Sequence, residues 1–273
     1  MNPKLSIIIP TYNRPVALSE LLASLAAQTY QDFEVIIIND AGSDISKIVD
    51  AYEELHCQII NLEQNSYHVR ARNRGLELAS GEWIMLIDDD DLILPTHIET
   101  MFQHTDDYDL LYSDVEIVNY METEMERIPL SSQLFAYTYD LDAMKKFSTY
   151  VPSGSMYKKS IHVEIGKFDE EMRNYWDWDF FLRVAEKYRV KRVPVASVLY
   201  EFSVTGNNQS KNLDKMRKYL DRLSEKHHLG TLPTKNFFIL LEEPEVKERE
   251  AVTKKIWDGK MIPSRYMKQF GTV

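Results

Sequence analysis

WIMLIDDDD, residues 83–91, joins an unbroken apolar run to four consecutive aspartates. Similar runs rich in isoleucine occur at residues 5–9, 33–38 and 58–62. Near-continuous apolar runs of this length are typical of strands that are covered on both faces of a sheet. We therefore expect residues 83–87 to form a buried strand whose end delivers the aspartates to one edge of a sheet.

Between these strands, apolar residues recur at the spacing of one helix face. Leucines at positions 18, 21, 22 and 25 follow the i, i+3, i+4, i+7 pattern, and residues 45–52 and 69–79 show similar stripes. Gly81 is expected to supply the C-cap of the helix over residues 69–79, and Pro95 to open another helix. Alternating strands and helices predict an α/β fold, a mostly parallel sheet flanked by helices on both faces.

The pattern weakens after Tyr120. Residues 121–133 are polar and irregular, which favours an excursion or a mobile loop, whereas residues 108–118 and 191–202 resemble strands and residues 177–188 a helix. Leucines and a methionine between residues 213 and 223 predict one more helix. The other face of that helix is basic, with Lys211, Lys215, Arg217, Lys218, Arg222 and Lys226.

Composition excludes several classes of protein. The 273 residues include 43 acidic and 32 basic side chains, a net charge of −11, which argues against a nucleic-acid partner. The single cysteine, Cys57, allows neither an internal disulfide nor a cysteine zinc cluster. Residues 1–14 lack the features of a signal peptide, and no apolar run approaches the roughly 20 residues that span a bilayer. We therefore expect a cytoplasmic protein.

Ligands of open parallel sheets bind beyond the carboxyl ends of the strands. Here those ends are residues 10–14 (PTYNR), 39–40 (ND) and 88–91 (DDDD). The first strand is followed neither by G-x-G-x-x-G nor by a P-loop, which disfavours a dinucleotide site and a P-loop NTPase.

The aspartate run suggests a metal site. Four like charges repel one another unless a cation neutralises them, and Mg²⁺ and Mn²⁺ prefer carboxylate oxygens and share coordination with substrate phosphates. The alternative is a solvated acidic turn that caps the helix at Pro95. Because a buried strand delivers these carboxylates, we favour a metal–phosphate site.

Three further positions have two interpretations each. Asp40 caps the following helix or accepts a hydrogen bond from a base or ribose. Tyr12 stacks on a nucleobase or packs at the strand end. Among Arg70, Arg72 and Arg74, at least one is expected on a solvated helix face, while another would pair with a diphosphate at the sheet edge.

A second cluster, WDWD at residues 176–179, opens the helix over residues 177–188. Aspartates at a helix start are often only caps. Tryptophans beside them favour sugar binding, because sugar rings stack on aromatic faces. A carboxylate next to indole surface has a raised pKa, which suits a general base.

The order of these motifs resembles glycosyltransferase family 2. The resemblance rests on residues 7–14 (IIIPTYNR), Asp40, residues 71–73 (ARN), residues 88–91 before Pro95, and then residues 152–155 (PSGS), 166–170 (GKFDE) and 177–183 (DWDFFLR). It covers roughly residues 4–210. It implies the GT-A fold, a nucleotide-sugar donor, a divalent cation (Mn²⁺ or Mg²⁺) and inversion at the anomeric centre.

The resemblance also implies roles for individual residues. The nucleotide would contact Pro10, Thr11, Tyr12, Arg14, Asp40, Arg72, Asp88 and Asp89. Asp90, with Asp88, would bind the metal, and Asp177 would be the catalytic base. The acceptor would contact Trp176, Trp178 and Ser155. Two stretches depart from the family pattern, namely Trp176 in place of a glutamate and residues 200–203 (YEFS) in place of Tyr-Arg-x-His.

We expect residues 1–205 to form the GT-A domain, with a nucleotide-sugar half (1–120) and an acceptor half (121–205), and residues 206–273 to form a helical extension. The predicted reaction moves a hexose or N-acetylhexosamine from a donor, UDP-linked by family frequency, to a glycan or lipid-linked acceptor, as in cell-surface polysaccharide synthesis. The alternatives are a catalytically silent glycan-binding protein and, less favoured, a sugar nucleotidylyltransferase.

The basic face of residues 211–226 and the tail over residues 254–268 have two interpretations. They would bind an anionic membrane surface, which would place the protein peripherally on the inner face of the membrane. Alternatively, they form a solvated helix face and a homodimer contact.

Overall fold

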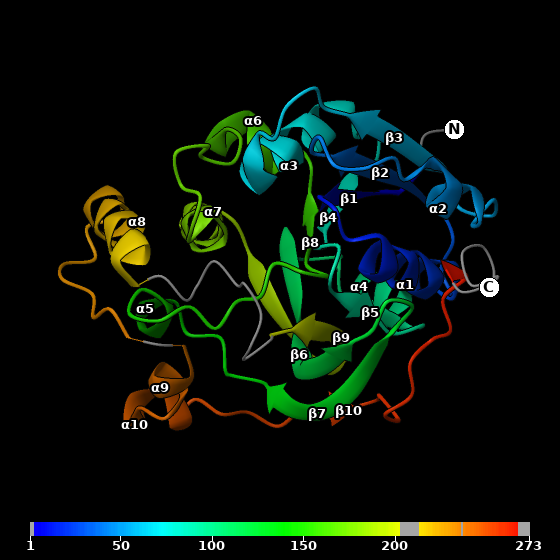
Figure 1. Cartoon of the computed structure of the whole chain (residues 1–273). Coiled ribbons are helices and arrows are strands. Elements are labelled where there is room, and N and C mark those ends of the chain that lie inside the picture. Colours follow the sequence, from blue (N-terminus) through cyan, green and yellow to red (C-terminus); the bar gives the residue numbers. More distant parts are fainter. Residues whose placement is uncertain (1–2, 203–212, 236, 267–273) are drawn as a thin grey trace.

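Four parallel strands form one half of the sheet, in the order β4-β1-β2-β3 (Figure 1). They are β1 (Leu5–Thr11), β2 (Phe33–Asn39), β3 (Cys57–Asn61) and β4 (Trp83–Leu86). The computed structural model describes residues 3–202, 213–235 and 237–266. The pairings β1–β2, β1–β4 and β2–β3 are all parallel, as the apolar runs predicted.

Helices cover both faces of this half. The helices α1 (Pro15–Ala26) and α2 (Ser46–Asp50) lie on one face, and α3 (Tyr67–Leu78) lies on the other. Successive residues of β1 belong to different core clusters. Ile7 belongs to the cluster that contains α1, and Ile8 belongs to the cluster that contains α3. Since both faces are buried, the strand sequence is apolar without alternation.

The other half of the sheet is mixed. It contains β6 (Leu110–Glu122), β8 (Met156–Lys158) and β9 (Val190–Glu201), in the order β9-β6-β8-β4. The short β8 runs antiparallel to both β4 and β6, whereas β6 and β9 are parallel. Strand β5 (Leu92–Ile93) pairs with β9 in the antiparallel direction, and β10 (Lys254–Lys255) pairs with β9 in the parallel direction. The predicted GT-A-like α/β architecture is thus confirmed.

The excursion or loop expected over residues 121–133 is wrong. Strand β6 continues to Glu122, and β7 (Arg127–Phe135) returns beside it as the second strand of a hairpin. Side chains in the middle of β7 are exposed, Leu130 at 60%. Because this edge strand buries little surface, its sequence lacks the apolar run or alternation that marks a strand.

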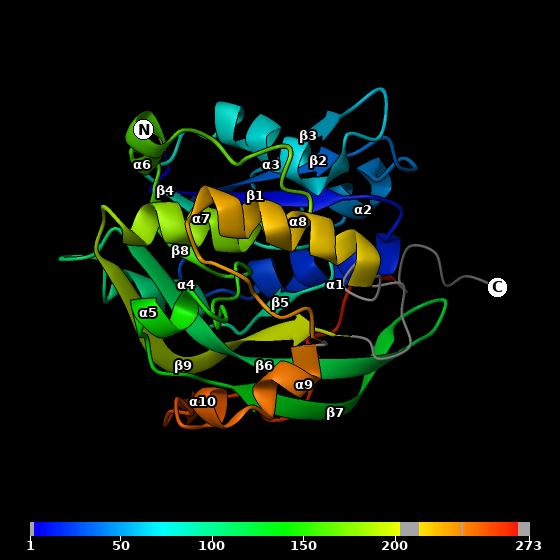
Figure 2. The same ribbon diagram turned by 90° about the vertical axis from the view of Figure 1, so that its left-hand side faces the viewer.

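Seven helices complete the described secondary structure: α4 (His97–Phe102), α5 (Leu141–Met144), α6 (Ile161–Ile165), α7 (Trp176–Ala185), α8 (Leu213–Lys226), α9 (Phe237–Leu241) and α10 (Pro244–Lys247). Figures 1 and 2 show α8 lying alongside α7. After α10 the chain adds β10 to the sheet and continues to α2, beside which Arg265 pairs with Glu54 at 2.8 Å. The extension is therefore helical only in part.

Much of the basic face of α8 binds the chain itself. Arg222 pairs with Glu171 at 2.5 Å, and Lys226 pairs with Asp169 at 2.7 Å. These two cations therefore pair with acidic groups of the domain. Lys211, Met267 and Lys268 lie outside the described residues. None of the helices in the described ranges is long and apolar enough to cross a bilayer.

Gly81 has a different role from the predicted C-cap. Helix α3 ends at Leu78, and its C-cap residue Ala79 has φ −56° and ψ 128°. A Cβ on Gly81 would lie 2.7 Å from the backbone nitrogen of Ser6 and 2.8 Å from the carbonyl carbon of Leu5. Glycine is needed here because the turn before β4 touches the backbone of β1.

We expect Gly81→Ala to lower the free energy of unfolding by about 1–3 kcal/mol, because backbone on both sides must move to admit the methyl group. Chemical denaturation measures the effect. Glu82→Ala, which removes only an exposed ion pair with Lys4, is the matched control and should cost less than about 1 kcal/mol. Equal stability of the two variants would contradict the close approach.

Candidate active site

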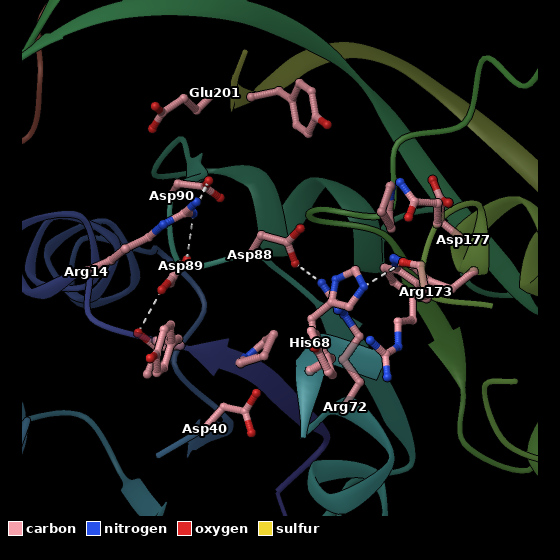
Figure 3. A pocket seen from close by; sticks show the side chains of 18 of the residues that line it. Arg14, Asp40, His68, Arg72, Asp88, Asp89, Asp90, Arg173, Asp177 and Glu201 are labelled. Atoms are coloured by element: carbon pink, nitrogen blue, oxygen red, sulfur yellow. Dashed lines mark hydrogen bonds and ion pairs between the residues drawn. The ribbon is translucent and has the colours of Figure 1, made fainter. Parts of the chain in front are cut away.

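A cavity of about 450 Å³ opens where the carboxyl ends of β1, β2 and β4 meet the first turns of α3 and α7 (Figure 3). Its lining includes most residues that the sequence analysis selected: Pro10, Thr11, Tyr12, Arg14, Asp40, Arg72, Asp88, Asp89, Asp90, Trp176 and Asp177. Parallel pairing brings the three strand ends to one edge, as expected.

Asp89 connects the aspartate run to β1. Its carboxylate accepts hydrogen bonds from the Thr11 hydroxyl at 2.7 Å and from Arg14 at 3.2 Å, and Arg14 also pairs with Asp90. Burial and the charge of Asp90 raise the pKa of Asp89 to about 7, although Arg14 and Thr11 oppose this rise. Burial therefore disfavours the ionised form of Asp89 even beside a guanidinium.

Asp91 is the most deeply buried aspartate of the run. Its side chain is 1% exposed and accepts hydrogen bonds from the Ser153 hydroxyl and, at 2.7 Å, from the backbone N–H of Glu201. Burial raises its pKa well above the ordinary range, and the charges of Asp90 and Asp88 add to the rise.

Three of the aspartates fit a divalent cation. Asp88, Asp90 and Asp91 each place one carboxylate oxygen such that the three lie within 4.8 Å of one another. Hard cations such as Mn²⁺ and Mg²⁺ prefer such oxygens, and their charge would offset the repulsion within the run. The chemistry and spacing of the donors agree with the predicted pair Asp88 and Asp90, and add Asp91.

Of Arg70, Arg72 and Arg74, Arg72 is the one that lines the cavity. It is 1% exposed, pairs with Asp88, and its guanidinium carbon lies 4.0 Å from the centre of the Trp176 ring. Arg70 and Arg74 instead form ion pairs on the exposed surface with Glu170 and Glu77. The solvated interpretation is therefore confirmed for these two.

Asp177 lies across the cavity from Asp89 and Asp90, in the first turn of α7 (Figure 3). Burial raises the pKa of Asp177 to about 6, and hydrogen bonds from backbone N–H groups of the helix start oppose the rise. A carboxylate with this pKa is ionised at neutral pH and still accepts a proton readily, as a general base must.

The pattern of Glycosyl transferase family 2 matches residues 6–166. The chain belongs to this family. A relative from Bacillus subtilis (strain 168), the uncharacterized glycosyltransferase YwdF, is 57% identical over 263 residues, which are 96% of this chain and 98% of that protein. The chain is therefore a family 2 glycosyltransferase.

Two solved structures share the fold. The crystal structure of S. aureus TarS 1-349 in complex with UDP-GlcNAc has a TM-score of 0.64 and 21% identity over 82% of this chain and 66% of that one. The mannosyltransferase PcManGT from Pyrobaculum calidifontis, in complex with GDP-Man and Mn²⁺, has a TM-score of 0.58 and 14% identity over 85% of this chain and 66% of that one. The glycosyltransferase thus spans about two thirds of both structures.

Two residues predicted to contact the acceptor lie in the core. The Trp178 side chain is buried, and its indole N–H donates to the carbonyl of Met144 at 2.8 Å. Ser155 is fully buried, and its hydroxyl lies 2.8 Å from that of Tyr150. Neither lines the cavity, so the prediction for both is corrected. Residues 176 and 178 point apart because a helix turns by about 200° in two residues.

His68, which no motif in the sequence marked, links α3 to the loop before α7. Its Nε2 lies 2.7 Å from the backbone oxygen of Arg173, so the neutral ring donates a hydrogen bond there. Burial, together with the charge of Arg72, lowers the pKa of His68 to about 4. Arg173 itself lies with its guanidinium carbon 3.7 Å from the centre of the Tyr67 ring, at the cavity. No spacing in the sequence marks these residues.

Strained backbone gathers around the cavity. Asn13, Ala41, Tyr67 and Tyr175 have positive φ, between 54° and 68°, and each is a lining residue or directly adjoins one. Such conformations cost of order 1 kcal/mol each and persist where surrounding structure holds them. Asn13 is a residue type that favours this conformation, whereas alanine and tyrosine at the other three positions give no signal for it.

The stretch that departs from the family pattern also lines the cavity, through residues 200–202. Ser203 lies outside the described residues. Glu201 forms an ion pair with the buried Arg127, which also pairs with Glu20 at 2.6 Å. Arg127 of β7 therefore joins β9, through Glu201, to α1, through Glu20, at the rim of the site.

Proposed function

We propose that the protein is an inverting glycosyltransferase that moves a sugar from a nucleotide-diphosphate sugar, UDP-linked, to a hydroxyl of a glycan or lipid-linked acceptor. One observation carries this proposal. A single cavity holds the carboxylates of Asp88 and Asp90 and, across from them, the carboxylate of Asp177. A donor diphosphate and an acceptor hydroxyl would fit between these groups.

The β1 and β2 ends would hold the nucleoside. Tyr12 is 49% exposed at the cavity, with a ring face available for a base. The buried Asp40 accepts hydrogen bonds from the N–H and hydroxyl of Ser66, which leaves its second oxygen for a ribose or base donor. The likeness to TarS, solved with UDP-GlcNAc, supports a uridine donor and an N-acetylhexosamine or hexose.

The aspartate run would hold the cofactor. Asp88 and Asp90 would bind Mn²⁺ or Mg²⁺, and PcManGT, solved with Mn²⁺, supports this choice. When bound, the ion would neutralise the donor diphosphate and the charge that develops on the leaving group. Arg14 and Arg72, each paired with one of these aspartates, would keep the carboxylates oriented toward the cavity.

Asp177 would act as the general base. Its carboxylate would take the proton of the acceptor hydroxyl while that oxygen forms a bond to the anomeric carbon. The bond from the anomeric carbon to the diphosphate oxygen breaks from the opposite face, and its electron pair leaves with the nucleoside diphosphate. One displacement inverts the configuration and needs one base, unlike hydrolysis by two carboxylates.

Asp177→Asn should lower kcat by about 10²–10⁴-fold and leave the Kd for the donor within twofold, because the amide keeps the shape but accepts no proton. Nucleoside diphosphate release and calorimetric donor titration measure the two effects. Glu171→Gln, an exposed change before the same helix, is the control. Near-normal turnover by the asparagine variant would exclude Asp177 as the base.

The acid limb of the pH profile should report on Asp177. Because its pKa is raised to about 6 and the ionised form is active, kcat/KM should fall about tenfold per pH unit below pH 6 and level off above it. Residual activity of Asp177→Asn should lack this limb. A limb that the variant retains would belong to another group.

Metal-dependent binding should depend on Asp90. We expect UDP-sugars to raise the melting temperature of the wild-type protein more with Mn²⁺ than with a chelator, and Asp90→Ala to lose that difference. Asp50→Ala, an exposed aspartate outside the cavity, should keep it. GDP-sugars with equal or larger shifts would overturn the uridine assignment, and binding without turnover would favour a silent binding protein.

A further inference from the structure

The helix that carries Asp177 begins without a side-chain cap. Its N-cap residue, Tyr175, is left-handed with φ 60°, and its side chain makes no capping hydrogen bond. A side-chain cap normally fixes the start of a helix by binding its free N–H groups. The position of this first turn therefore depends on contacts with the rest of the protein.

Asp179, in the same turn, has three charged or polar partners. It is fully buried, and Arg183 donates to its Oδ2 at 2.9 Å. Its Oδ1 lies 2.8 Å from the Nζ of Lys226 and 2.8 Å from the Nε2 of His227. Lys226 ends α8 and His227 follows it, so the C-terminal extension supplies two of the three partners.

The two aspartates of the turn face different neighbours. Asp177 lines the cavity, whereas Asp179, about 200° further around the helix, faces α8. A rotation of α7 that moved one would move the other. Leu220 and Leu223 of α8 are buried in the core cluster that also contains Trp178, so α8 forms a firm support.

We propose that Lys226 and His227 are positioning residues, which hold α7 through Asp179 in the rotation that directs Asp177 into the cavity. This inference rests on the proposed function and assigns the C-terminal extension a part in catalysis. Neither residue lines the cavity, so each acts through Asp179 and not on the substrate.

The chain offers a matched pair of variants. Lys226 and Arg222 both lie on α8 and both pair with Asp169, at 2.7 Å and 3.7 Å, but only Lys226 also reaches Asp179. Lys226→Met and Arg222→Met therefore each remove a cation that joins α8 to the loop before α7. They differ in two contacts, since Lys226 also pairs with Asp179 and Arg222 also pairs with the exposed Glu171.

In the full-length protein, we expect Lys226→Met to lower kcat by about 10–100-fold, since a shift of about 1 Å in a reacting group has effects of this size. The donor KM should stay within twofold. Arg222→Met should keep kcat within twofold, even if its melting temperature falls as much as that of Lys226→Met. Lys226→Arg should restore kcat. His227→Leu should lower kcat, and His227→Gln, which keeps an N–H donor, should retain most of it.

Amide hydrogen exchange over residues 176–180 provides a readout that needs no turnover. Exchange should be faster in Lys226→Met than in Arg222→Met and normal in Lys226→Arg. A wild-type level of kcat in Lys226→Met, or loss of kcat equal to that of Arg222→Met, would overturn the positioning role alone. A wild-type protein that transfers no sugar would overturn the proposed function, and this inference with it.

Discussion

The crowding of four carboxylates at the end of β4 is the constraint on which the site depends. Strand β4 is buried on both faces and ends shortly before residues 88–91. Because Asp89 and Asp91 are themselves buried, water cannot fully screen the repulsion among the four carboxylates. Compensating charge comes from two directions, Arg14 before α1 and Arg72 on α3. Burial and the charge of Asp90 still raise the pKa of Asp89, and a divalent cation at the run would offset the repulsion among the carboxylates. The two arginines and such a cation would therefore offset the same repulsion.

Helix α3 connects the acidic run to α7. Arg72 pairs with Asp88 on one side and lies against Trp176, the first residue of α7, on the other. At the next position of the helix, the side chain of Asn73 donates to the carbonyl of Phe168 at 2.9 Å. This helix therefore helps to set the separation between the acidic run and Asp177, and the proposed reaction needs a diphosphate and an attacking hydroxyl in fixed relation.

The sequence predicted those features that continuous burial and chain order determine. Strands covered on both faces admit only apolar runs, so the parallel half and the polar residues that follow its strands were evident. Strand β7 was missed because its exposed middle imposes no such pattern. His68 and Arg173 were missed because each acquires its place through tertiary contacts. Trp178 was misassigned because the rotation of α7, which no local spacing reports, turns it into the core.

The two aspartates of α7 show how environment separates identical side chains. Burial raises the pKa of both, but Asp179 also receives a hydrogen bond from His227 and the charges of Arg183 and Lys226, which together lower its pKa to about 2. Asp177 has only backbone donors and a more distant Arg72 to oppose burial, and its pKa is about 6. A carboxylate with tight cationic partners is a permanent anion and a poor base, while one that is buried without them accepts a proton near neutral pH. Both kinds of carboxylate lie within one helical turn of α7. Asp179, with its cationic partners, anchors the helix, and Asp177, without them, faces the cavity.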